Sequence, residues 1–512
     1  MSSLDTQRIA KNTLFLYFRM ILTMGVSLYT SRVVLNVLGV ENYGVYSVVG
    51  GVVALFSFFN AAMASATQRF LSYDVGIGDS VKLKRTFNAT VNIHILIAVV
   101  VFLLAEVIGL WFINNKLNVE ASQIEATNWV FHFSLLTFIV SVIQVPYTAL
   151  IISKERMNIY AYLSIVEVLL KLAIVYLLII SPFDKLKTYA VLIFCVSLLV
   201  FLFFRIYCSV NFQESKYIFY FNKGMYREII SFSGWNLFGN VAAIARGQGS
   251  NIVLNIFFGT TVNAAYGITS QVRGAVSIFV RNFQMAVNPQ IIKTYAQNRL
   301  NECHKLIFQS SKLSYFLLFF ITVPLVVNID FVLELWLKNP PQYSGVFVQL
   351  ALFNLLIDSI SGPLMMGAQA TGRIKWYQII LGTFIFLDLP LTYLILSVYR
   401  EPHLAYVVTI IITSCTLVFR LFFLKRMISL DIGSYFRDVI LRLIGITVIS
   451  CFVVYFITLI TFSGDWARFV YTTVLLSLIN AGTISVLGLN SSERKFLIKK
   501  INEKIISKFS SK

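Results

Sequence analysis

Charged side chains are scarce in this sequence. Of its 512 residues only 13% are Asp, Glu, Lys or Arg, whereas 58% are hydrophobic. A soluble globular protein carries about 25% charged residues. With a mean hydropathy of +0.78, the chain has too much apolar surface for a water-soluble fold of this length to bury. The composition therefore excludes a soluble protein and indicates one that is embedded in a lipid bilayer.

Residue patterns that signal catalysis, cofactors or metals are also missing. The sequence contains no phosphate-binding glycine loop, no catalytic triad pattern and no long extramembrane segment. The cysteines have no metal-ligand spacing and mostly lie inside apolar runs, so we expect neither a disulfide framework nor a metal site. They are Cys195, Cys208, Cys303, Cys415 and Cys451. We expect no cofactor and no enzyme activity, because a membrane glycan polymerase or acyltransferase usually needs a sizeable loop or a clustered acid–base site.

The apolar residues come in long runs. A membrane-spanning helix needs about 20 mostly apolar residues, and helices satisfy their own backbone hydrogen bonds inside lipid. The first run is too long for a cleaved signal peptide, so we expect it to be the first span. The sequence predicts an all-α polytopic membrane protein with about 14 spans, at residues 12–38, 42–68, 84–112, 126–152, 157–181, 187–210, 228–257, 261–287, 305–336, 345–369, 375–398, 403–425, 438–462 and 467–488.

Basic residues alternate between the connecting segments. The formal net charge is +19, but the excess follows the positive-inside rule for membrane proteins better than it indicates nucleic-acid binding. Every second loop is basic, which predicts that both termini are cytoplasmic. These loops carry Lys82, Lys84 and Arg85; Lys154 and Arg156; Lys216, Lys223 and Arg227; Lys293, Arg299 and Lys305; Arg373 and Lys375; and Lys425, Arg426 and Arg437. Residues 491–512 are predicted to form a basic amphipathic helix on the inner leaflet.

The chain contains an internal repeat. Pro146 and Pro363 lie 217 residues apart, and three further pairs match at that offset: Arg156 with Arg373, Tyr160 with Tyr377, and Tyr176 with Tyr393. Near the front of each half, Ser31-x-x-Val34-Leu35-Asn36 resembles Ser250-x-x-Val253-Leu254-Asn255. We therefore predict two pseudo-symmetric lobes, residues 1–220 and 225–490. Such a body suits alternating access by rocking of one lobe against the other.

Two arginines are expected deep in the membrane. Arg246 lies 13 residues before Gly259 and Arg273 lies 14 after it, which places both about 20 Å from that turn at about 1.5 Å per residue. A charge near mid-bilayer costs roughly 2.5–3.5 kcal/mol, so such residues face a cavity. We interpret them as a cationic site for phosphate or acidic sugars, because Arg suits oxyanions. The aligned first-half positions are Ser27 and Gly51, which are uncharged.

Other polar residues in the spans extend this hypothesis. The candidate cavity also includes Arg19, Arg32, Gln248 and Gln271. Arg69 and Arg281 are near inner span ends, where we expect their side chains to reach the membrane surface. Asp358 and Asp388 are roughly mid-span; they either pair with arginines or titrate during coupling to H⁺ or Na⁺. The sequence does not decide between these roles.

The opening of the chain resembles a known family. The residues are Lys11-Asn12-Thr13, Ser31-Arg32-Val33-Val34-Leu35, and Leu38-Gly39-Val40-Glu41-Asn42-Tyr43-Gly44-Val45-Tyr46. They resemble the O-antigen (Wzx-like) flippases of the multidrug/oligosaccharidyl-lipid/polysaccharide (MOP) exporter superfamily. The resemblance implies a V-shaped 14-helix fold that flips undecaprenyl-pyrophosphate-linked oligosaccharide across the bacterial inner membrane. It also implies contact with membrane lipids, a monomeric state, and a polysaccharide polymerase or other glycan-assembly proteins as partners.

A multidrug or organic-cation exporter of the same fold is the alternative. Such exporters need buried carboxylates in the binding lobe, and the first span has Arg19 and Arg32 but no acid. The sequence therefore favours an anionic cargo.

Overall fold

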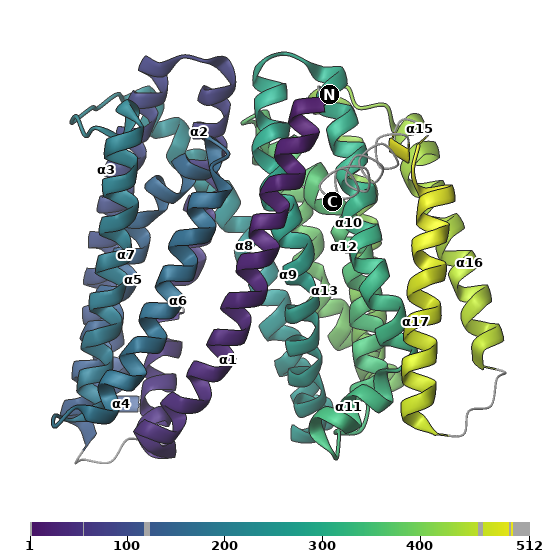
Figure 1. Cartoon of the computed structure of the whole chain (residues 1–512), viewed down its shortest axis with the longest axis horizontal. Coiled ribbons are helices and arrows are strands. Elements are labelled where there is room, and N and C mark those ends of the chain that lie inside the picture. The colour runs from purple at the N-terminus through teal and green to yellow at the C-terminus, as the bar shows by residue number, and fades with distance from the viewer. Residues whose placement is uncertain (1–2, 55, 117–122, 459–463, 491–492, 495–512) are drawn as a thin grey trace, which may run out of the picture. The chain divides into compact units, whose positions relative to one another are not determined.

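The chain folds into long α-helices (Figure 1). The computed structural model describes residues 3–54, 56–116, 123–458, 464–490 and 493–494, and within these ranges there is no strand. The predicted all-α polytopic fold is confirmed. Ten of the described helical segments are long and apolar enough to cross a membrane. The C-terminal segment predicted to be amphipathic lies outside the described residues, apart from Glu493 and Arg494.

The first half of the chain contains α1 (Ser3–Ala54), α2 (Ser57–Ile77), α3 (Ser80–Leu104), α4 (Leu110–Lys116), α5 (Ile124–Ser153), α6 (Met157–Ile180) and α7 (Lys185–Asn211). The second half contains α8 (Lys223–Phe258), α9 (Thr260–Ala296), α10 (Leu300–Val327), α11 (Ile329–Leu337), α12 (Ser344–Ala370), α13 (Lys375–Tyr399), α14 (Leu404–Ile428), α15 (Ile432–Tyr435), α16 (Leu441–Thr458) and α17 (Asp465–Thr483). Short π-helical turns join α3 to α4, join α15 to α16, and extend α17.

The same turn opens both halves. Gly39 interrupts α1 with φ 78°, and Gly259 separates α8 from α9 with φ 74°. A side chain is strained at such positive φ, so glycine is the residue of choice there. Each glycine follows the repeated Val-Leu-Asn motif by three or four residues. The two halves therefore share a local backbone device as well as a sequence pattern.

Four of the long helices that the structure describes are not among the ten apolar spans, namely α1, α2, α8 and α9. Of these, α8 and α9 have 36 and 37 residues. Arg246 lies on α8 and Arg273 on α9. Helices of this kind need neighbours or water on one side, because lipid cannot solvate arginine or glutamine.

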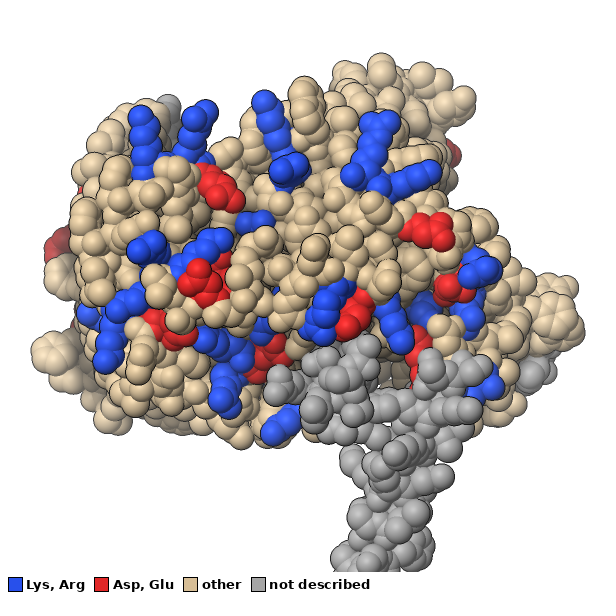
Figure 2. All heavy atoms as spheres, turned by 90° about the horizontal axis from the view of Figure 1, so that it is seen from above, with Lys and Arg blue, Asp and Glu red and all other residues tan. Residues whose placement is uncertain are grey.

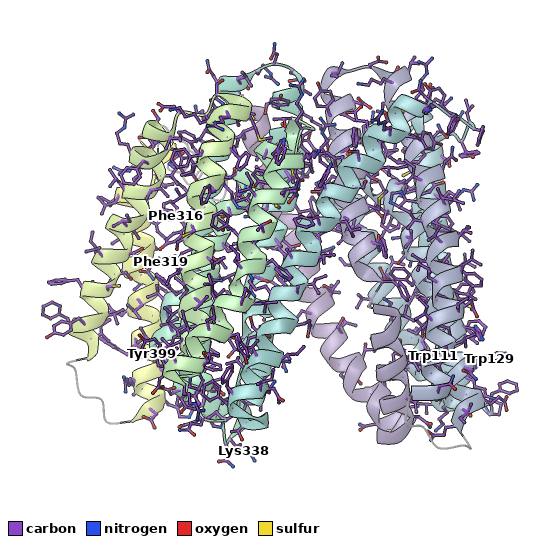
Figure 3. All side chains as sticks on the ribbon, turned by 180° about the vertical axis from the view of Figure 1, so that it is seen from behind. Trp111, Trp129, Phe316, Phe319, Lys338 and Tyr399 are labelled. Atoms are coloured by element: carbon purple, nitrogen blue, oxygen red, sulfur yellow. The ribbon has the colours of Figure 1, made fainter. Side chains whose placement is uncertain are left out.

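The two ends of the helices differ in their side chains. Lysine and arginine gather at the end where α2 meets α3 and α5 meets α6, as Figure 2 shows from above. At the opposite ends of their helices lie Trp111 on α4 and Trp129 on α5 (Figure 3). Tryptophan favours the membrane interface, where its ring is apolar and its N–H can meet water. We call the first of these ends the basic end.

The described contacts form two compact units. Unit 1 contains residues 1–241, 285–303 and 369–379; unit 2 contains residues 242–284, 304–368 and 380–512. The core of unit 1 includes Leu71, Phe87, Leu150 and Phe204, all buried. The predicted lobes, residues 1–220 and 225–490, stay a prediction. Unit 1 takes in second-half segments because the basic ends of α9, α12 and α13 contact the first half of the chain.

Arg69 makes one of these contacts. Its side chain is 5% exposed, and it donates from Nε to the Gln369 carbonyl at 3.2 Å and from Nη2 to the Ala370 carbonyl at 3.0 Å. Rings of Phe70 and Tyr73 lie within 5 Å of its guanidinium. The expectation that Arg69 reaches the membrane surface is therefore wrong. The guanidinium group instead donates to two backbone carbonyls at the end of α12.

Glu155 makes a matching contact. It lies in the turn between α5 and α6, accepts a hydrogen bond from Gln290 Nε2 at 2.6 Å, and pairs with Lys293; both partners are on α9. By the sequence repeat this turn corresponds to the turn between α12 and α13, which binds Arg69. The turn between α5 and α6 thus contacts α9 of the second half, and the end of α12 contacts α2 of the first half.

The Arg69 contact generates a stability prediction. The Arg69→Leu variant removes two buried, charge-assisted hydrogen bonds to the end of α12, so we expect it to lower the free energy of unfolding by about 3 kcal/mol. The matched control is Arg281→Leu, because Arg281 is exposed and, within the described part of the chain, donates only to Ser277 of its own helix. That change should stay within about 0.5 kcal/mol. Thermal unfolding in detergent measures both; equal melting temperatures would contradict the burial argument.

Candidate functional site

A pocket opens inside unit 2 between α8, α9, α12 and α14. Its volume is about 150 Å³, which is the size of an engineered cavity that holds benzene. It therefore admits one small group rather than a whole oligosaccharide. The lining residues are Ala243, Arg246, Gly247 and Ser250 from α8; Tyr266, Ser270 and Arg273 from α9; Ala351 and Asn354 from α12; and Ala405, Tyr406 and Thr409 from α14.

The two arginines reach this pocket because their helices meet at Gly259. α8 and α9 run in opposite directions from that glycine, so residues at similar sequence distances from it lie at similar depth. Arg246 and Arg273 are both half-buried and line the same pocket. Among the described lining residues there is no Asp or Glu. The pocket is consequently positive, and its charge is not cancelled by an acid on its wall.

Aromatic rings shape the wall beside the arginines. The Tyr266 and Tyr406 rings lie 5.9 Å apart, and Tyr406 also packs against Phe347 at 5.1 Å. The Tyr266 hydroxyl donates to the Gly247 carbonyl at 2.9 Å, which ties α9 to α8. This packing holds two helices in register, so the wall is rigid around the guanidinium groups.

The pocket also offers neutral hydrogen-bonding groups. Ser250, Ser270 and Thr409 line it with hydroxyls, and Asn354 lines it with an amide. Within the described part of the chain, Asn354 Oδ1 is buried without a hydrogen-bond partner. Such an acceptor is costly to leave unpaired. A ligand that carries both oxyanions and hydroxyls would satisfy the arginines and Asn354 together.

Asp388 lies directly behind this wall. Its side chain is fully buried on α13, and Oδ1 lies 3.3 Å from the hydroxyls of Thr392 and Thr409. Thr409 is itself a lining residue, and Arg246 is near enough to act electrostatically on the carboxyl group. Its Oδ2 has no hydrogen-bond partner among the described residues. Whether Asp388 titrates or only pairs stays a prediction.

The remaining predicted residues lie elsewhere. Gln248 and Gln271 are exposed and do not line the pocket, and Asp358 is half-buried on α12 outside it. Arg19 lies in unit 1, where it donates to Ser164 Oγ at 3.5 Å and covers the Tyr160 ring. The side chain of Arg32 is outside the described residues.

Sequence reasoning missed the residues that complete the pocket. Asn354, Tyr406 and Thr409 come from α12 and α14, far along the chain from the arginines. Tyr266 did carry a signal, because the Tyr266-Gly267 pair repeats Tyr43-Gly44 of the first half. Position in the repeat, however, does not report which side of a helix faces a pocket.

The sequence was compared with models of known protein families and with curated proteins. Residues 9–295 match the family described as "Polysaccharide biosynthesis protein". A search of the curated proteins found no match.

Several solved transporters share the fold. An outward-facing multidrug resistance MATE family transporter of the MOP superfamily has a TM-score of 0.70 at 12% identity, over 84% of this chain and 98% of that one. The MATE transporter ClbM in complex with Rb⁺ also scores 0.70, at 16% identity over 83% and 96%. A MOP superfamily transporter from Pyrococcus furiosus Vc1, described as having a binding pocket of reverse polarity, scores 0.67 at 12% identity over 82% and 96%.

These similarities show the fold alone, but the family match covers more than half of the chain. The chain is therefore a multi-pass membrane protein with the fold of the MOP-superfamily MATE transporters, and it belongs to the polysaccharide biosynthesis protein family.

Proposed function

We propose that the protein flips an undecaprenyl-pyrophosphate-linked oligosaccharide, the repeat unit of an O-antigen, capsule or exopolysaccharide, across the cytoplasmic membrane. The observation that carries this proposal is the pocket with two arginines and no described acid on its wall. In this account the pocket holds the pyrophosphate while the polyprenyl tail stays in lipid. Alternating access then carries the glycan across.

The chemistry of the pocket suits a pyrophosphate. Guanidinium groups form paired, charge-assisted hydrogen bonds to phosphate oxygens, and these are about twice as strong as neutral ones. Two arginines match the two phosphate groups. The hydroxyls of Ser250 and Ser270 supply further donors. Because the cavity is small, the pyrophosphate or one sugar fits, and the rest of the glycan must lie outside.

The alternative is an organic-cation exporter, since the fold also serves MATE multidrug transporters. A cation would have to sit between Arg246 and Arg273, and like charges at such range repel. Asp388 is a carboxylate in the same region, but it lies behind the wall and Thr409 covers its Oδ1. The pocket therefore favours anions. A reversed pocket polarity is also described for the transporter from Pyrococcus furiosus.

The setting of this function is proposed on the same grounds. The basic end faces the cytoplasm with both termini, in a bacterial inner membrane, because basic loops stay on that side. The protein acts as a monomer among membrane lipids and delivers the glycan to a polysaccharide polymerase or other assembly proteins.

Transport of defined cargo tests the proposal. The purified full-length protein in liposomes should move undecaprenyl-pyrophosphate-linked oligosaccharide between leaflets, and it should leave the accumulation of lipophilic organic cations unchanged. Accessibility of the glycan to an external glycosidase measures the first process, and cation fluorescence measures the second. Cation transport without glycan movement would reject the flippase in favour of the exporter.

The arginines generate a second prediction. Arg246→Ala and Arg273→Ala should each reduce glycan flipping about 10- to 100-fold, because each removes charged hydrogen bonds of about 1.5–3 kcal/mol. The lysine variants should recover part of the activity, since Lys keeps the charge but loses the paired geometry. Gln248→Ala, on α8 but outside the pocket, is the matched control and should flip normally. Normal flipping by both alanine variants would remove the pocket from the mechanism.

A further inference from the structure

A polar stripe runs along α6 in unit 1. It consists of Tyr160, Ser164, Glu167 and Lys171, spaced four, three and four residues apart, which places them on one face of the helix. Exposed Tyr162, Val166, Leu169 and Ala173 repeat the same spacing two residues later, so they cover roughly the opposite face. In a membrane the apolar face contacts lipid, and the stripe points away from it.

The stripe is held from one side by α1. Arg19 donates to Ser164 Oγ at 3.5 Å, and its guanidinium carbon lies 4.8 Å from the centre of the Tyr160 ring. α1 and α6 pack along each other. In the part of the stripe nearer the basic end, the Arg19 guanidinium is therefore fixed against the Tyr160 ring and the Ser164 hydroxyl.

The part of the stripe farther from the basic end is partly exposed. Lys171 Nζ lies 2.6 Å from Glu167 Oε1, and the two side chains are 39% and 33% exposed. These residues are about 15–20 Å along the helix from its basic end, which is mid-membrane depth. An ion pair at this depth is costly in lipid. The apolar, lipid-facing side of α6 is the other one, so the exposed part of the pair lies on the face turned away from lipid.

An apolar cluster lies between the stripe and the basic end. Leu16, Ile152, Met157 and Ala286 form a buried cluster at the basic end, with Tyr160 packed against it. The stripe thus begins where this cluster ends.

We propose that this stripe is a saccharide-binding surface, with Glu167 and Lys171 as hydrogen-bonding partners for sugar hydroxyls and Tyr160 as a ring for sugar C–H groups. It rests on the proposed function and deepens it: the arginine pocket has room for the pyrophosphate or one sugar, and the stripe takes part of the remaining glycan. An acid and a base side by side offer both acceptors and donors, which is what hydroxyl groups require.

Binding by full-length protein to two lipids tests the proposal. The probes are undecaprenyl pyrophosphate and the same lipid with its oligosaccharide, extracted from the cells that make it. Wild type should bind the glycan-bearing lipid about tenfold more tightly. The double variant Glu167→Ala, Lys171→Ala should lose most of that difference and keep its affinity for undecaprenyl pyrophosphate. The matched control Val166→Ala, Leu169→Ala, on the lipid side, should keep both affinities.

A second measurement guards against a variant that fails to fold. In a chain without its native cysteines, a Lys171→Cys change should react with a membrane-impermeant thiol reagent, and a Leu169→Cys change should not. An unreactive Lys171→Cys protein, or a stripe variant that still prefers the glycan-bearing lipid, overturns the saccharide surface while the arginine pocket stands. Wild-type protein that binds neither lipid overturns the proposed function, and the surface with it.

Discussion

The cost of placing charge in a lipid bilayer governs this structure. Each arginine inside the helical region needs a partner or water, and four described arginines meet this need in three ways. Arg69 is buried against carbonyls at the end of α12. Arg19 lies over Tyr160 beside Ser164. Arg246 and Arg273 line one pocket. Arg69 and Arg19 thus contact the protein's own groups, whereas Arg246 and Arg273 line the pocket that we propose binds a ligand.

The pocket lies within unit 2, but three of its four helices extend beyond that unit. α8, α9 and α12 each have residues in unit 1. Near their basic ends, α9 contacts Glu155 and the end of α12 contacts Arg69. These helices are continuous between the pocket and those contacts, which is the connection that the proposed alternating access needs.

Much of the fold follows from the sequence because the bilayer simplifies it. Apolar runs of fixed length give the helices, and alternating basic loops indicate their direction. The turn at Gly259 was enough to place Arg246 and Arg273 at one depth, because an α-helix rises evenly along its axis. Depth in the membrane, however, does not determine which way a side chain points. The angle around each helix, which keeps Gln248 and Gln271 out of the pocket, depends on tertiary packing, as do the contributions of Asn354 and Tyr406. For Arg69 the expectation failed because its partners are carbonyls at the end of α12, 300 residues away in the sequence, and a local sequence pattern does not report such a contact.

The position of the phosphorus atoms in a structure with bound lipid-linked glycan tests the central claim most directly. The account predicts that the pyrophosphate lies within hydrogen-bonding distance of the guanidinium groups of Arg246 and Arg273, with the glycan outside the pocket. A pyrophosphate bound away from both arginines, or a pocket that is filled by a cation, would contradict it.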